Sequence, residues 1–111
     1  LNVEYFIING GLNDAGVIRN AIVSGASAAD LLGTVSSVEV STATVEDFDT
    51  STTAGALEKL FCYIRTNYPK AKIGFVVSYN CYGTAETSTF YREQVAPLTR
   101  LICEKCKNEI P

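Results

Sequence analysis

A short glycine-rich and polar run follows the first apolar segment of the chain and carries residue types that a chemical site needs. It spans residues 9–14 and reads Asn-Gly-Gly-Leu-Asn-Asp. Gly11 permits a tight turn with a positive φ angle, and the side-chain amide of Asn13 can donate N–H bonds to a developing oxyanion. Asp14 can cap the turn and hold that amide in place, while the plainer alternative is that both polar residues only cap a turn. The run therefore predicts either an oxyanion-stabilising site or an ordinary turn.

Two continuous apolar segments predict the strands that would position this run. They lie within residues 1–9, where the run Tyr5-Phe6-Ile7-Ile8 is continuous, and within residues 72–78. This pattern is typical of strands buried on both faces of a parallel sheet. Ligands of such sheets bind beyond the carboxyl ends of the strands, and Tyr79 and Asn80 follow the second strand at that end. We therefore take Tyr79 and Asn80 as candidate substrate-binding residues, with a plain loop as the alternative.

A helix is predicted between the two strands. Apolar residues recur at three- and four-residue intervals from Ala54 to Ile64, which is typical of one helix face. The Ser/Thr/Asp cluster at residues 49–52 can cap the first amides of the helix, and Pro69 ends it. Strand, helix and strand together predict a right-handed βαβ unit and an α/β fold.

The stretch between the glycine-rich run and this helix has a different texture. Residues 15–53 are rich in Ser, Thr, Gly and Ala, and no period persists for long. A long irregular stretch is typical of a functional loop. Within it we expect a short helical turn inside residues 20–32 and a short strand at residues 38–40.

A last helix face runs from Tyr91 to Cys106 at helical spacing. Pro97 interrupts this face, because proline has no N–H to donate and its ring collides with the preceding turn. We therefore expect a break or kink near Ala96, with Pro97 opening a second helical segment.

Composition excludes several classes of function. The net charge is -3 without a basic patch, so nucleic-acid binding has no support. The apolar runs are too short to span a bilayer, and Gly10-Gly11 does not make a nucleotide-binding glycine loop. Histidine is absent, which removes the commonest general base and metal ligand. The pair Cys103 and Cys106 alone cannot fill a zinc shell, so we expect free thiols on a helix, no metal and no cofactor.

The glycine-rich run also resembles a known family. Residues 11–14, Gly-Leu-Asn-Asp, are similar to the G-x-N-D block of the SGNH, or GDSL-type, ester hydrolases. Residues 5–10 resemble the strand that leads into this block. The stretches 49–52 and 55–58 resemble the start of the family's next helix, and residues 68–75 resemble the turn and strand that follow. The resemblance covers most of the chain in the right order.

The resemblance implies a fold and a division of labour. The fold would be a flavodoxin-like α/β/α sandwich with a parallel sheet, and residues 3–9 and 72–78 would be its third and fourth strands. Residues 1–111 would then form a partial domain, because neither the Gly-Asp-Ser block with the nucleophile nor the Asp-x-x-His block with the base occurs in them. Asn13 would be the oxyanion-hole donor, supported by Gly11 and Asp14.

The implied function is part of a serine ester hydrolase, an esterase or lipase whose candidate substrates are small-molecule or carbohydrate esters, acetylated carbohydrates included. We expect the chain alone to be inactive and its sheet to be completed by a complementing fragment or by a second copy. The alternative, from a different class, is a non-catalytic α/β binding or interaction module. The acyl group, the alcohol and the compartment, cytoplasmic or secreted, stay open.

Overall fold

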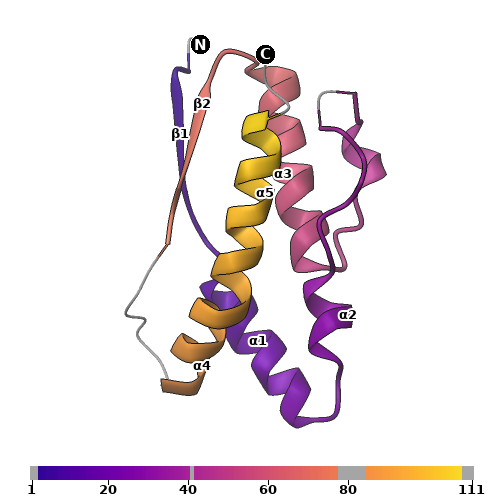
Figure 1. Cartoon of the computed structure of the whole chain (residues 1–111), viewed down its shortest axis with the longest axis vertical. Coiled ribbons are helices and arrows are strands. Elements are labelled where there is room, and N and C mark those ends of the chain that lie inside the picture. The colour runs from indigo at the N-terminus through magenta and orange to yellow at the C-terminus, as the bar shows by residue number, and fades with distance from the viewer. Residues whose placement is uncertain (1–2, 41, 78–84, 109–111) are drawn as a thin grey trace.

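The computed structural model describes residues 3–40, 42–77 and 85–108. Two strands lie beside a group of helices (Figure 1). In chain order the elements are β1 (Tyr5–Asn9), α1 (Leu12–Val23), α2 (Ala28–Leu32), the 3₁₀ turn η1 (Val45–Asp47), α3 (Thr53–Asn67), β2 (Lys72–Val76), α4 (Ala85–Phe90), the π-helical turn η2 (Tyr91–Val95) and α5 (Ala96–Asn108).

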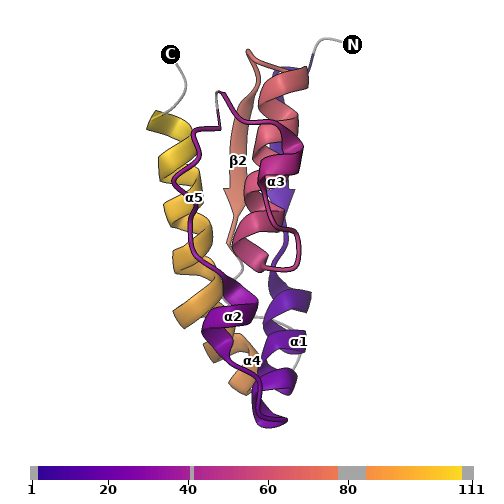
Figure 2. The same cartoon turned by 90° about the vertical axis from the view of Figure 1, so that its right-hand side faces the viewer.

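The two strands form a parallel pair, as predicted from the βαβ pattern. Tyr5 pairs with Lys72 at one end of the ladder, and Asn9 pairs with Val76 at the other. Helices α3 and α5 lie along the same face of this pair (Figures 1 and 2). The predicted α/β class is confirmed, and β1 and β2 fall inside the predicted strand segments.

The other face of the strand pair is open in the described part of the chain. Tyr5, Ile7 and Val76 are exposed to 62%, 70% and 45%, whereas Ile8 and Phe75 pack against the core. Side chains of successive strand residues point to opposite faces, so alternate residues face the helices and the rest face outward. The prediction of strands buried on both faces is therefore met on one face only.

Helix α3 follows its prediction closely. The Thr52 side chain caps it by accepting a bond from the Gly55 N–H at 3.0 Å, and Tyr68, just before Pro69, is its C-cap residue. Gly55 is required here because a Cβ atom would lie 1.8 Å from the backbone oxygen of Asp49. The turn before the helix can therefore fold back against its first residues.

The long loop expected from residue 15 onward is wrong over its first part. Helix α1 starts directly after the glycine turn and runs to Val23, and α2 follows within the predicted 20–32 region. From residue 13 to the end of α1, Ala15 and Ile18 are the buried residues, while Val17 and Val23 are 68% and 76% exposed. Apolar residues on several sides of the helix obscure the single stripe that identifies an amphipathic helix.

The strand expected at residues 38–40 is also wrong. This segment is irregular, and Val40 is buried in the core beside α3 and α5. The backbone groups of Ser36 and Val38 bond to charged side chains of those helices instead of to a neighbouring strand. Hydrogen bonds to side chains satisfy the backbone as a ladder would.

At Ala96, where we expect a break or kink, the helix has a widened turn and does not end, and α5 begins there with Pro97 in its first turn. The Ala96 N–H bonds to the carbonyl of Tyr91, five residues back. A π-helical turn opens the backbone at the point where Pro97 offers no N–H of its own. The helix therefore passes the proline without stopping.

Two apolar clusters fill the interior, and the continuous helical run from α4 through η2 to α5 contributes residues to both. One gathers around α3 and α5 with Phe61, Cys62 and Ile102. The other joins α1 and α2 to η2 through Ile18 and Tyr91. In the cluster around α1, Tyr91 and Val95 pack against Gly11 and hold the glycine turn in place.

Candidate functional site

The glycine turn after β1 is held in a defined position. Gly11 has φ 87° and ψ -12°, the left-handed region that glycine adopts without strain. A Cβ atom on Gly11 would lie 2.9 Å from Cγ1 of Val95 and 3.4 Å from a ring carbon of Tyr91. The Tyr91 hydroxyl also donates to the carbonyl of Gly10 at 3.4 Å. Glycine at position 11 is thus required both by its backbone angles and by the close approach of η2.

Asn13 and Asp14 lie in the first turn of α1, directly beyond the carboxyl end of β1, and both are exposed. The first backbone N–H groups of a helix have no partner within it and carry the positive end of its dipole. Asn13 therefore lies, exposed, in the turn of α1 whose backbone N–H groups are free to donate. No hydrogen bond joins either side chain to another described residue, and Gly11 supplies no side-chain cap.

The two strands end side by side, since Asn9 of β1 pairs with Val76 of β2. Asn13 therefore belongs to the end of the sheet at which ligands of parallel sheets bind. Tyr79 and Asn80, the candidate substrate-binding residues, lie outside the described residues. The structure thus brings together Gly11, Asn13 and Asp14.

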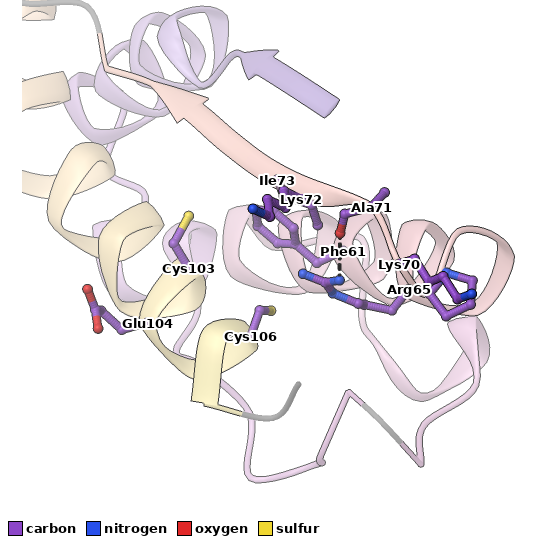
Figure 3. Close-up of a pocket in the computed structure, with 10 residues that line it drawn as sticks. Phe61, Arg65, Lys70, Ala71, Lys72, Ile73, Cys103, Glu104 and Cys106 are labelled. Carbon is purple, nitrogen blue, oxygen red and sulfur yellow. Dashed lines mark hydrogen bonds between the residues drawn. The ribbon is translucent and has the colours of Figure 1, made fainter. Parts of the chain in front are cut away.

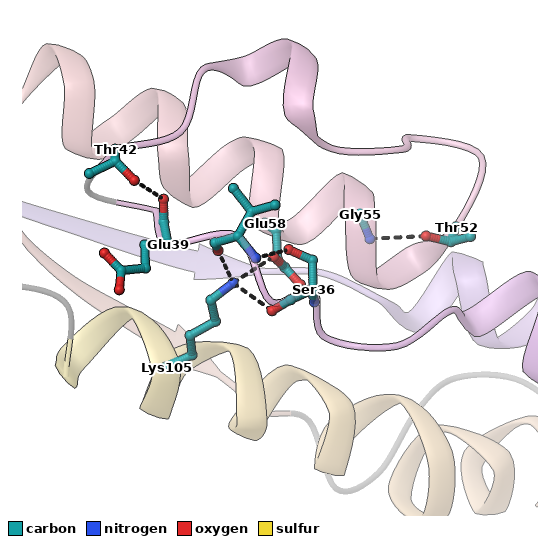
Figure 4. A network of polar contacts seen from close by, with 8 residues as sticks. Ser36, Glu39, Thr42, Thr52, Gly55, Glu58 and Lys105 are labelled. Carbon is teal, nitrogen blue, oxygen red and sulfur yellow. Dashed lines mark hydrogen bonds and ion pairs between the residues drawn. The ribbon is translucent and has the colours of Figure 1, made fainter.

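A buried ion pair that sequence reasoning missed joins α3 to α5. Glu58 is fully buried, and its Oε2 lies 3.0 Å from the Nζ of Lys105. Its Oε1 accepts from the Ser36 N–H at 2.7 Å, while Lys105 also donates to the carbonyls of Ser36 and Val38 at 3.0 and 2.5 Å. Figure 4 shows these bonds converging on the irregular segment between α2 and α3.

This network has the character of a structural anchor. Both carboxylate oxygens of Glu58 have a donor, and the Lys105 ammonium has three acceptors. A catalytic acid or base needs access to a substrate, and Glu58 has none. The sequence gives little indication of this ion pair, because Glu58 is a single charged residue among the apolar residues of α3.

The cysteines that the structure describes lie on helices and none of them is in a disulfide, as predicted for Cys103 and Cys106. Cys62 on α3 and Cys106 on α5 are buried, and Cys103 is half-buried. Burial, and then the neighbouring Glu104 charge, raise the pKa of Cys103 above its ordinary value. The Cys103 thiol therefore stays protonated at neutral pH. Among the residues that the structure describes, no group of three potential metal ligands gathers around it.

A pocket of about 740 Å³ opens at the other end of the strands, between α3, β2 and α5. A smaller one of about 370 Å³ lies beside α4. Asn13 lines neither of these two pockets.

None of the helices that the structure describes is both long enough and apolar enough to cross a bilayer. Comparisons of the chain with protein-family models, with curated proteins and with solved structures find no match.

Proposed function

We propose that this chain supplies the oxyanion-hole part of a serine ester hydrolase of the SGNH type, built on a flavodoxin-like α/β/α sandwich. The observation that carries the proposal is the position of the Gly-Leu-Asn-Asp block. Gly11 makes a left-handed turn at the carboxyl end of β1, and Asn13 follows, exposed, in the first turn of α1. In acyl transfer a donor at such a place stabilises the oxygen of the tetrahedral intermediate.

The residues divide the work as follows. The Asn13 amide donates an N–H bond to the oxyanion, and the dipole of α1 adds positive potential at the same end. Gly11 lets the turn approach Val95 and Tyr91, which fixes where α1 begins. Asp14 lies in the first turn of α1, where a carboxylate is favoured by the dipole. The nucleophile and the base would come from a Gly-Asp-Ser block and an Asp-x-x-His block that residues 1–111 do not contain.

The test has two parts. The isolated chain should hydrolyse p-nitrophenyl acetate no faster than buffer does, because it has neither nucleophile nor base. In the gene product that contains this chain together with both blocks, Asn13→Ala should lower kcat by about 100- to 1000-fold with a much smaller change in KM. The matched control is Asn20→Ala, an exposed asparagine on the same helix, which should leave both constants unchanged. Enzyme-like turnover by the isolated chain, or equal effects of the two substitutions, would contradict the proposal.

A second candidate is a non-catalytic α/β interaction module. The open face of the strand pair, with Tyr5, Ile7 and Val76 exposed, favours it. This candidate requires that no neighbouring sequence supplies the two blocks. Sequencing the gene on either side of Leu1 and Pro111 distinguishes the two, and size-exclusion chromatography of the chain reports whether the open face pairs with a second copy.

A further inference from the structure

The 740 Å³ pocket lies at the amino end of the strands, away from Asn13. Its walls come from the end of α3, the turn into β2 and the end of α5 (Figure 3). The lining includes one guanidinium, two lysines at the turn, two thiols and an aromatic ring. The lining residues include Phe61, Arg65, Lys70, Lys72, Ile73 and Cys103.

Arg65 has a donor that the described residues leave without a partner. Its Nη1 donates to the carbonyl of Ala71 at 2.8 Å, while its Nε is buried and unbonded. A buried donor without an acceptor destabilises the folded chain, and more so when it belongs to a charged group. Burial lowers the pKa of Arg65, although the neighbouring Cys106 opposes the shift, and a guanidinium stays protonated in proteins. The pocket therefore contains a positive group in need of an acceptor.

The other walls combine positive charge with apolar surface. Phe61 is 1% exposed and forms part of the lining with Ile73. Lys70 and Lys72 are exposed at the turn and the strand start, so they add positive potential. The one acidic lining residue, Glu104, points away from Arg65 (Figure 3). An anion with an apolar body fits both properties.

We propose that this pocket binds a small amphipathic carboxylate, with its head on Arg65 and its apolar body against Phe61 and Ile73. Nη1 of Arg65 is held by the Ala71 carbonyl, so the carboxylate would first accept from Nη2. Nε lies on the same edge of the guanidinium but is covered in the ligand-free chain, and a shift of the Arg65 side chain on binding would let the carboxylate accept from both. The planar carboxylate matches the fork of donors on a guanidinium, the two lysines add attraction at longer range, and the volume is within the range of small-molecule sites. The site is separate from Asn13 and does not depend on ester hydrolysis.

Calorimetric titration of the 111-residue chain with decanoate, below its micelle concentration, tests the proposal. Decanoate should bind, and decanol, which has the same chain without the charge, should bind at least about 10-fold more weakly. Arg65→Gln should weaken decanoate binding by about 10- to 100-fold and leave decanol binding unchanged. Arg100→Gln removes an exposed charge from α5 outside the pocket and should leave decanoate binding within about twofold of the unmodified chain.

A second measurement needs no substitution, and it decides the matter if Arg65→Gln fails to fold. Cys103 is half-buried and lines the pocket, so bound decanoate should slow its alkylation by N-ethylmaleimide, as read from peptide masses. Inorganic phosphate at the same concentration should give no protection, because it has no apolar body. Equal binding of decanoate and decanol, protection of Cys103 by phosphate equal to that by decanoate, or unchanged alkylation of Cys103 in the presence of decanoate would each overturn the proposal.

Discussion

Removing the Lys105 ammonium tests how the irregular segment between α2 and α3 is held. In Lys105→Met, the Glu58 carboxylate keeps its place at 0% side-chain exposure, with the Ser36 N–H as its one remaining bond among the described residues. The carbonyls of Ser36 and Val38 lose a charged donor as well. Breaking a buried ion pair from one side costs about 3–5 kcal/mol. Because the Lys105 side chain is 15% exposed, water reaches its end of the pair, and we expect about 3 kcal/mol.

Urea denaturation followed by far-UV circular dichroism measures this loss. A domain of this size has a total stability of about 5–15 kcal/mol, so a loss of about 3 kcal/mol moves the midpoint clearly. Arg100→Met removes an exposed charge from the same helix and should change the free energy of unfolding by less than about 0.5 kcal/mol. Glu58→Gln combined with Lys105→Met should cost less than the sum of the two single changes, because the partners share one interaction. A loss below about 1 kcal/mol for Lys105→Met, the range of exposed ion pairs, would refute the anchor.

Two further outcomes are expected. Gly11→Ala should destabilise the chain by about 2–4 kcal/mol, because of the left-handed backbone and the collision with Val95. Gly25→Ala, also at positive φ but with no atom within 4 Å, should cost about 1–2 kcal/mol. Equal losses of stability in the two variants would contradict the close packing of η2 against Gly11. The pKa of Cys103 is raised in the folded chain, so the folded state keeps the thiol proton to a higher pH than the unfolded state does. The stability that this proton contributes is complete below about pH 9 and is lost as the pH rises from there through the pKa of the folded state. Cys103→Ala should therefore flatten the decline of stability above about pH 9 in urea titrations, and an unchanged slope would show that the thiol is not protected by burial.

The parts of the fold that the sequence predicts are those with one dominant physical signal. The segments of β1 and β2 are continuous apolar runs, and α3 has a single stripe, a cap at Thr52 and a stop at Pro69. Each of these signals is local, so neighbouring residues suffice to read it. The glycine turn belongs to the same group, because the positive φ of Gly11 is the angle that a sharp strand-to-helix turn needs.

The parts that escaped prediction depend on contacts between distant residues. Helix α1 has exposed apolar residues such as Val17, and its buried Ala15 and Ile18 gain their place from η2 and α2. The segment near Val38 has the composition of a strand but bonds to Lys105, which lies 67 positions further along the chain. A local sequence pattern cannot predict a hydrogen-bond partner so far along the chain. The candidate site divides in the same way, since the position of Asn13 follows from its neighbours and the pocket at Arg65 follows from three separate elements.

The π-helical turn gives the helix from α4 to α5 one residue more than a regular α-helix would have at this point. Each residue of an α-helix adds a rotation of about 100°, so taking one exposed residue such as Gln94 out of the turn would rotate everything before it by that angle relative to α5. Tyr91 would lose its hydrogen bond to the Gly10 carbonyl, and the turn before α1 would lose its packing against Tyr91. The extra residue ahead of Pro97 therefore lets one continuous helix pack into both apolar clusters and fixes where α1 begins.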